Sequence, residues 1–141
     1  MQLDIAQRIV AATLAHARSR NMLPLAVAVL DARGSPRSLA AEDGTSLRRS
    51  DIAVGKAHGA LAMGLGSRTL MKRAETQPHF IAAVTHAVGG SLIPVPGGVL
   101  IRDAQGALVG AVGVSGDTSD NDEACAIVAI ESVGLKADPG A

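Results

Sequence analysis

The apolar residues of this chain are almost all small, and this limits its fold more than any other feature. The sequence has 26 alanines and 16 glycines, one phenylalanine, and neither tryptophan nor tyrosine. A core of Ala, Val, Leu and Ile lets backbones approach closely but offers few large side chains. The lack of aromatic rings argues against single-stranded nucleic-acid binding, which uses them as stacking platforms, and against a cofactor site built on aromatic stacking.

Length and cysteine content indicate one domain over residues 1–141, with its core at about 3–135. At 141 residues the chain has the size of one ordinary domain. It has no 18-residue apolar run and no basic segment followed by an apolar one at its start, so we expect no membrane partner, no secretory signal and a cytoplasmic location. The single Cys125 excludes an intrachain disulfide and a multi-cysteine zinc site.

The first third of the chain has the pattern of a helix followed by a β-hairpin. Apolar residues recur at helical spacing over 3–20, which predicts an amphipathic helix. The short apolar run 25–30 predicts a buried strand, the Asp31–Gly34 segment a turn, and 38–42 the returning strand.

The middle of the chain is predicted to be helical. Residues 51–64 form a helix rich in Ala and Gly, with Ser50 as its N-cap. Each glycine costs about 0.8–1 kcal/mol in a helix relative to alanine, so several of them need close packing against a neighbour. Shorter helices are expected at 67–76 and 78–87.

A second hairpin and a last helix complete the pattern. Strands are expected at 99–102 and 108–114, a helix at 119–133, and a frayed tail at 136–141. The order is α-ββ-α(αα)-ββ-α. It predicts an α+β fold in which helices pack on an antiparallel sheet made of two hairpins.

Several segments together resemble the GlcG/HbpS family of small haem-binding or haem-degrading-type proteins, whose relatives include the C-terminal domain of PduO-type adenosyltransferases. The carrying segments are Val27–Gly34, Asp43–Gly44, Ser50–Ala57, Pro94–Val99, Gly110–Asp117 and Asp120–Glu123. The resemblance implies a profilin-like α+β domain that forms homo-oligomers, often octamers. It also implies binding of haem or a related small molecule in some members.

Lys56 is the candidate catalytic residue. It stands in the Ala- and Gly-rich helix, where a lysine either extends outward to solvent or lies beside an anion. Partial burial would lower its pKa and let it act as a base or form a Schiff base. Arg48 and Arg49 precede the same helix and could hold a carboxylate near its N-terminus, although Asp51 in the first turn opposes an anion there. We include Arg48 and Asp51 among the candidate ligand-binding residues.

Two glycines and two histidines complete the candidate ligand site. Gly97 and Gly98 either line a pocket or form a turn into the next strand. No pair of histidines has the i, i+4 spacing of a helical zinc site, and no metal site is predicted. One neutral imidazole suffices as an axial haem ligand, and His58 and His86 are our candidates.

Charge is unevenly distributed along the sequence. Residues 1–80 hold 11 Lys and Arg against 6 Asp and Glu, whereas 81–141 hold 2 against 7. The two parts form either solvated surfaces or patches that pair between subunits. The acids Asp117, Asp120, Asp122 and Glu123 suit the N-terminus of the last helix, and a hard-metal site is the alternative. Cys125 is expected to pack as a small apolar residue.

The main hypothesis is an oligomeric small-molecule-binding protein of the GlcG/HbpS type, with haem or a small anionic metabolite as its ligand. The alternative is a cofactor-independent small enzyme that acts on a carboxylated metabolite, with Lys56 as base and a nearby arginine as anchor. A third hypothesis is an assembly module whose pocket has lost its role. Whether the chain is an enzyme stays open at this point.

Overall fold

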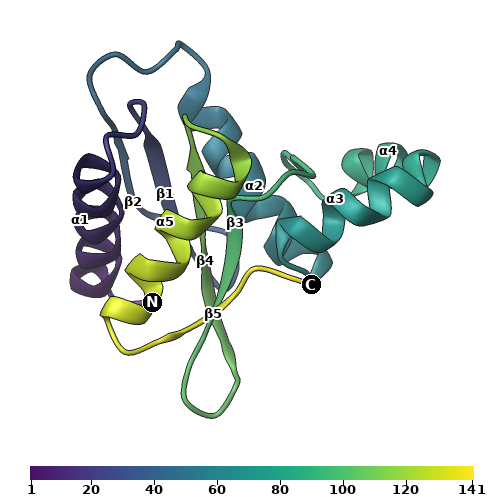
Figure 1. Ribbon diagram of the computed structural model, residues 1–141. Coiled ribbons are helices and arrows are strands. Elements are labelled where there is room, and N and C mark those ends of the chain that lie inside the picture. Colours follow the sequence, from purple (N-terminus) through teal and green to yellow (C-terminus); the bar gives the residue numbers. More distant parts are fainter.

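The computed structural model describes residues 1–141 as one five-stranded antiparallel sheet with five helices, three of which pack on its faces (Figure 1). The strands are β1 (Ala26–Asp31), β2 (Pro36–Ala41), β3 (Gly98–Arg102), β4 (Leu108–Ser115) and β5 (Lys136–Asp138). Their order across the sheet is β2-β1-β4-β3-β5, and every neighbouring pair is antiparallel. The predicted α+β fold with two hairpins, in the profilin-like arrangement, is confirmed.

Both hairpin turns are closed by an aspartate. The Oδ1 atom of Asp31 accepts hydrogen bonds from the backbone N–H groups two and four residues further on, at 2.9 and 3.0 Å. Asp103 does the same at 2.9 Å for both bonds. Such local bonds offer the chain a ready turn. The two Asp-Ala-x-Gly segments therefore place both hairpins as the sequence predicted.

The helices cover the two faces of the sheet unequally. They are α1 (Leu3–Ser19), α2 (Arg49–Met63), α3 (Ser67–Thr76), α4 (Pro78–Ala87) and α5 (Ser119–Ser132). Helices α1 and α5 lie side by side on one face, α2 crosses the other face, and α3 and α4 project away from the sheet (Figure 1). None of the helices combines the length and the apolar character that crossing a membrane would require.

The side of the sheet under α1 and α5 is aliphatic. Its strand residues are fully buried with the inner faces of the two helices, and they are Val27, Val29, Val99, Ile101, Val112 and Val114. The side under α2 carries mainly alanine and glycine, together with Leu30 and Leu100, which pack against alanines of the helix. An added Cβ at Gly113 would lie 1.8 Å from the carbonyl oxygen of Ala53 on α2. The small residues are thus required for the close approach of α2 to the sheet.

Two local predictions were wrong. The tail does not fray at its start, because Lys136–Asp138 forms β5 beside β3, where Arg102 Nε and Asp138 Oδ2 lie 2.9 Å apart. Ser50 does not cap α2, because the helix begins at Arg49, two residues before the predicted start, and Arg48 occupies the cap position without a side-chain bond. Both errors come from contacts that local sequence does not report.

Candidate functional site

Lys56, the candidate catalytic residue, forms a buried ion pair with Asp122. Its Nζ lies 3.1 Å from Asp122 Oδ2 and donates to the carbonyl oxygen of Val114 at 2.9 Å. The two side chains are 3% and 2% exposed. Asp122 Oδ1 accepts a third bond, from the N–H of Asp117 at 3.0 Å. The anion beside Lys56 therefore belongs to the protein itself, and the pair joins α2 to the first turn of α5.

Burial acts against both charges of this pair. Loss of water lowers the pKa of Lys56, although the Asp122 carboxylate acts in the opposite direction. The same loss raises the pKa of Asp122, against the favourable effect of Lys56. Each group therefore depends on its partner to stay charged. Lys56 lines none of the three cavities of the molecule, so the geometry adds no support to the enzyme hypothesis.

Gly97 and Gly98 lie against this pair and do not line a cavity. Gly97 has a φ of +121°, and a Cβ on it would lie 2.5 Å from the oxygen of Val114 and 2.9 Å from Lys56 Nζ. The N–H of Gly98 donates to Ser67 Oγ at 2.7 Å. In the structure this loop packs closely at the start of β3, and neither glycine lines a hollow.

Arg48 and Asp51 pair with each other at the surface, away from Lys56. Arg48 Nη1 lies 3.1 Å from Asp51 Oδ2, and their side chains are 79% and 64% exposed. Arg49 turns inward instead, and its Nη1 donates to Ser115 Oγ at 3.2 Å. The structure therefore does not bring Arg48 and Asp51 together with the other candidate residues.

The two candidate histidines do not share a site. His58 Nδ1 lies 2.8 Å from the carbonyl oxygen of Ser91, and the ring borders a small hollow of about 200 Å³ with Arg33 and Val88. His86 lies exposed on α4 and lines no cavity.

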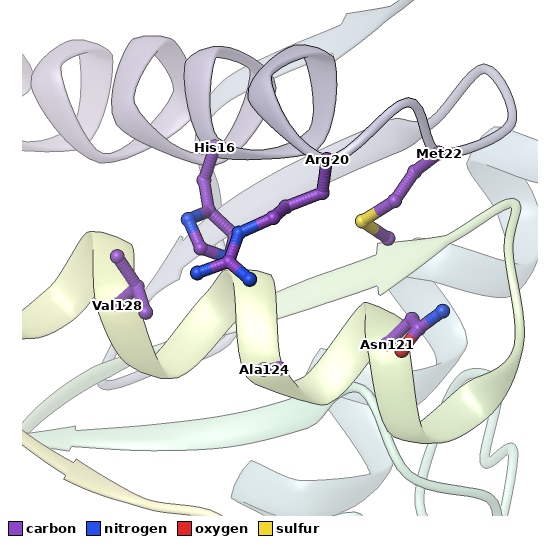
Figure 2. A pocket seen from close by; sticks show the side chains of 6 residues that line it. All are labelled: His16, Arg20, Met22, Asn121, Ala124 and Val128. Carbon is purple, nitrogen blue, oxygen red and sulfur yellow. The ribbon is translucent and has the colours of Figure 1, made fainter.

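The largest hollow, of about 500 Å³, opens between α1 and α5, and sequence reasoning did not single it out. We call it the α1–α5 groove, and its lining residues are His16, Arg20, Met22, Asn121, Ala124 and Val128. Figure 2 shows His16 and Arg20 projecting from α1 toward α5. The half-buried His16 ring has no hydrogen-bond partner in the protein, and Arg20 takes part in no ion pair. Both groups are free to contact a ligand.

One end of the groove is braced by sulfur contacts. Cys125 is fully buried beneath it, with its Sγ 3.4 Å from Met22 Sδ, as expected for a small apolar residue. Burial raises the pKa of the Cys125 thiol to about 11, so it stays protonated near neutral pH. This thiol therefore supports Met22 and is not a nucleophile.

Asp117 fastens the loop after α1 to the start of α5. Its Oδ2 accepts from the N–H of Leu23 at 2.8 Å, and its Oδ1 accepts from Asn121 Nδ2 at 2.8 Å. The bond from Leu23 is the main reason that the pKa of Asp117 lies below its usual value. The carboxylate thus fixes the distance between the two walls at this end of the groove.

Ion pairs also fix α5 from the side opposite the groove. Arg68 of α3 binds Glu123 at 3.0 Å and also contacts Asp120, which raises its pKa. Together with the Lys56 pair, these contacts neutralise much of the charge imbalance between the two parts of the sequence within one chain. No group of three or more His, Cys, Asp or Glu side chains is placed to hold a metal ion.

His16 and Arg20 could have been noticed in the sequence. They stand four residues apart, so they share one face of the predicted helix, and Met22 follows two residues after Arg20. The sequence could not predict the groove itself, because its other side is formed by α5, and no local pattern indicates that α5 packs beside α1.

The fold and the groove define a class: a small profilin-like α+β domain with a ligand-sized hollow that presents one histidine and one arginine. The family model for the haem degrading protein HbpS-like family matches residues 1–131. The chain belongs to the HbpS-like family.

Solved structures agree over nearly the whole chain. A crystal structure of a PduOC:haem complex is 23% identical, with a TM-score of 0.84 and 96% of each chain covered. Protein ORFY of Klebsiella pneumoniae is 23% identical, with a TM-score of 0.83 and 95% of this chain and 90% of its own covered. A double mutant of HbpS from Streptomyces reticuli is 26% identical, with a TM-score of 0.80 and coverage of 95% and 87%. No curated protein matches the sequence.

Proposed function

We propose that this chain binds haem in the α1–α5 groove, with His16 as the axial ligand. The observation that carries the proposal is the unpartnered imidazole of His16 beside the unpaired guanidinium of Arg20 in the largest hollow. Membership of the HbpS-like family and the haem complex of the structural relative PduOC support this ligand over a small anionic metabolite.

The lining residues fit such a ligand chemically. A neutral imidazole nitrogen is a common axial ligand of haem iron, and a guanidinium suits the carboxylates of the haem edge. Met22, Ala124 and Val128 provide apolar contact for a flat ring system without aromatic stacking. The volume of about 500 Å³ lies within the usual range of ligand pockets. When bound, haem would supply an iron centre with a further axial position.

Self-association is the second part of the proposal. The groove is open to solvent, and Val128 on its wall is 41% exposed. A flat apolar ligand held there would keep one face in water, which is unfavourable unless another subunit covers it. We therefore propose a homo-oligomer, with the octamer implied by the family resemblance as the expected form.

Haem titration of the purified apo protein tests the ligand. Absorbance is followed together with the elution volume of the protein peak. We expect a saturable Soret shift with one haem per chain, and at least a tenfold loss of affinity in His16→Ala, because the iron–imidazole bond is lost.

His58→Ala and His86→Ala are the matched controls and should bind as the wild type does. Weak, non-saturating absorbance would contradict haem binding. Loss of the Soret shift in His58→Ala alone would contradict the location in the groove.

A further inference from the structure

The strand β2 is an open edge of the sheet. It pairs only with β1, whereas the short β5 covers β3 at the opposite edge (Figure 1). The N–H of Glu42 bonds to the oxygen of Leu25 next to β1, so hydrogen-bonding groups alternate along the strand. Those of Leu39 and Ala41 therefore point away from β1, whereas the pairing is irregular at Arg37, which has no partner on β1. An edge of this kind is a ready template for pairing with another strand.

Only one end of this edge is protected. Pro36 and Arg37 at its start are residues that usually block edge pairing. The following stretch 38–41 carries no charge, and the Leu39 side chain is 46% exposed. The second half of β2 thus combines free backbone groups with an exposed apolar side chain.

Opposite charges flank the uncharged stretch. Arg37 and Asp43 are both exposed, and neither takes part in an ion pair. A two-fold axis at Ala40 would place Leu39 opposite Ala41 of a second copy and bring Arg37 close to Asp43 of that copy. Leu39 and Ala41 are hydrogen-bonded positions of such an antiparallel ladder, because both direct their backbone groups outward. Arg37 stands at the irregular start of β2 and Asp43 in the turn after it, so these two charges flank the ladder at its ends. The edge is therefore complementary to itself in both hydrogen bonding and charge.

A hollow beside Asp43 has room for the arginine of the second copy. It measures about 490 Å³ and is lined by Arg18, Pro24, Ala41, Glu42 and Asp43. The charge of Glu42 is already matched by Arg18, whose Nε lies 3.0 Å from it. The Asp43 carboxylate is left without a cation in this hollow.

We propose that β2 is an interaction surface for a second copy of this chain, with which it forms a two-fold antiparallel strand pair centred on Ala40. Arg37 of each copy then enters the hollow beside Asp43 of the other. This inference rests on the self-association proposed above and identifies one of its surfaces, and it does not depend on haem.

Charge reversal tests the surface. The mass of wild type, Arg37→Asp, Asp43→Arg and the double variant Arg37→Asp/Asp43→Arg is measured by sedimentation at low micromolar concentration. Each single variant turns two attractive cross-strand pairs into repulsive ones, so we expect association at least about tenfold weaker and the mass to fall to half or less. The double variant restores opposite charges and should regain the wild-type mass.

Two further variants keep the test decisive. Arg33→Asp makes the same charge change in the adjacent turn and should leave the mass unchanged. Leu39→Arg places a like charge beside the two-fold axis at an exposed position, so it should also dissociate the pair without unfolding the chain. Thermal unfolding followed by circular dichroism verifies the fold of each variant.

The outcomes separate this inference from the rest of the proposal. A monomeric wild type would overturn both self-association and the β2 surface. An oligomeric wild type whose mass no variant changes, or a double variant as dissociated as the single ones, would overturn the β2 surface alone. A negative haem titration would overturn the ligand without affecting either.

Discussion

The two faces of the sheet are packed with side chains of different size. Under α2, Gly113 and neighbouring alanines let the helix approach until an added methyl group would collide with its backbone. Under α1 and α5, aliphatic side chains fill the space, and the two helices leave a hollow of about 500 Å³ between them. Close packing under α2 leaves no room for a ligand, and the proposed binding site lies on the face with larger side chains.

The charged groups of the two faces differ in the same way. Lys56 meets Asp122 and a backbone carbonyl, which leaves nothing for a ligand to satisfy. His16 and Arg20 are directed into the groove without protein partners. The buried Lys56–Asp122 pair therefore stabilises the fold, whereas the unpartnered side chains of His16 and Arg20 can contact a ligand.

The largest effect is expected at the closely packed face. Lys56→Met leaves the Asp122 charge buried without a partner and should lower the free energy of unfolding by about 3–5 kcal/mol. Urea unfolding measures it, with the exposed Lys72→Met as control. The double variant Lys56→Met/Asp122→Leu should recover most of the loss. A loss below about 1 kcal/mol in the single variant would mean that the pair does not hold α5 to α2.

A smaller effect is expected from adding one methyl group to the same face. Gly113→Ala places a Cβ into the backbone of α2 and should cost about 3 kcal/mol. Ala124→Val adds methyl groups to the open groove and should change stability by less than about 0.5 kcal/mol. Both changes in the free energy of unfolding are measured by thermal and urea unfolding. Equal losses for the two variants would contradict the difference in packing between the two faces.

The sequence predicted the fold well because the decisive signals are local. The Asp31 and Asp103 turns fix both hairpins, and apolar spacing marks the long helices. It missed β5, because the apolar and polar residues alternate there over only four residues, Leu135 to Asp138, and the strand forms only against the edge of β3.

The site was predicted less well, because it depends on which helices meet. For Lys56 the sequence left open whether it extends to solvent or lies beside an anion, because its partner Asp122 lies 66 residues further along the chain. The four acids were explained by the N-terminus of the helix, whereas Asp122 and Glu123 are buried and paired. His16 is a candidate ligand only because α5 forms the other side of the groove, and the sequence does not predict that contact.

A moderate effect on binding is expected at the groove. Arg20→Gln removes a positive charge that could bind a haem carboxylate and should weaken haem binding about fivefold, which corresponds to an exposed ion pair worth about 1 kcal/mol. Arg8→Gln, on an exposed part of the same helix, is the matched control. Titrations at low and high salt measure both. If Arg20→Gln bound haem as the wild type does at low salt, this arginine would have no part in the site.

The smallest effect concerns the end of the groove and depends on pH. Asp117→Ala removes the bond to Leu23 and should cost about 1 kcal/mol at pH 7. Because the folded state lowers the pKa of Asp117, its stabilisation is present above the unfolded value of 3.8 and is lost as the pH falls through the lower folded value. The difference between variant and wild type, measured by urea unfolding, should therefore shrink below about pH 4. A constant difference across this range would contradict a role for the ionised carboxylate.

The most direct test follows the histidine rings themselves. Protein labelled with ¹⁵N in the imidazole rings is titrated with gallium protoporphyrin, a diamagnetic analogue of haem, and observed by NMR. We predict that the ring signals of His16 shift to values typical of a metal ligand, while those of His58, His79 and His86 stay in place. Metal-ligand shifts at His58, or at no histidine, would contradict the assignment of the α1–α5 groove as the binding site.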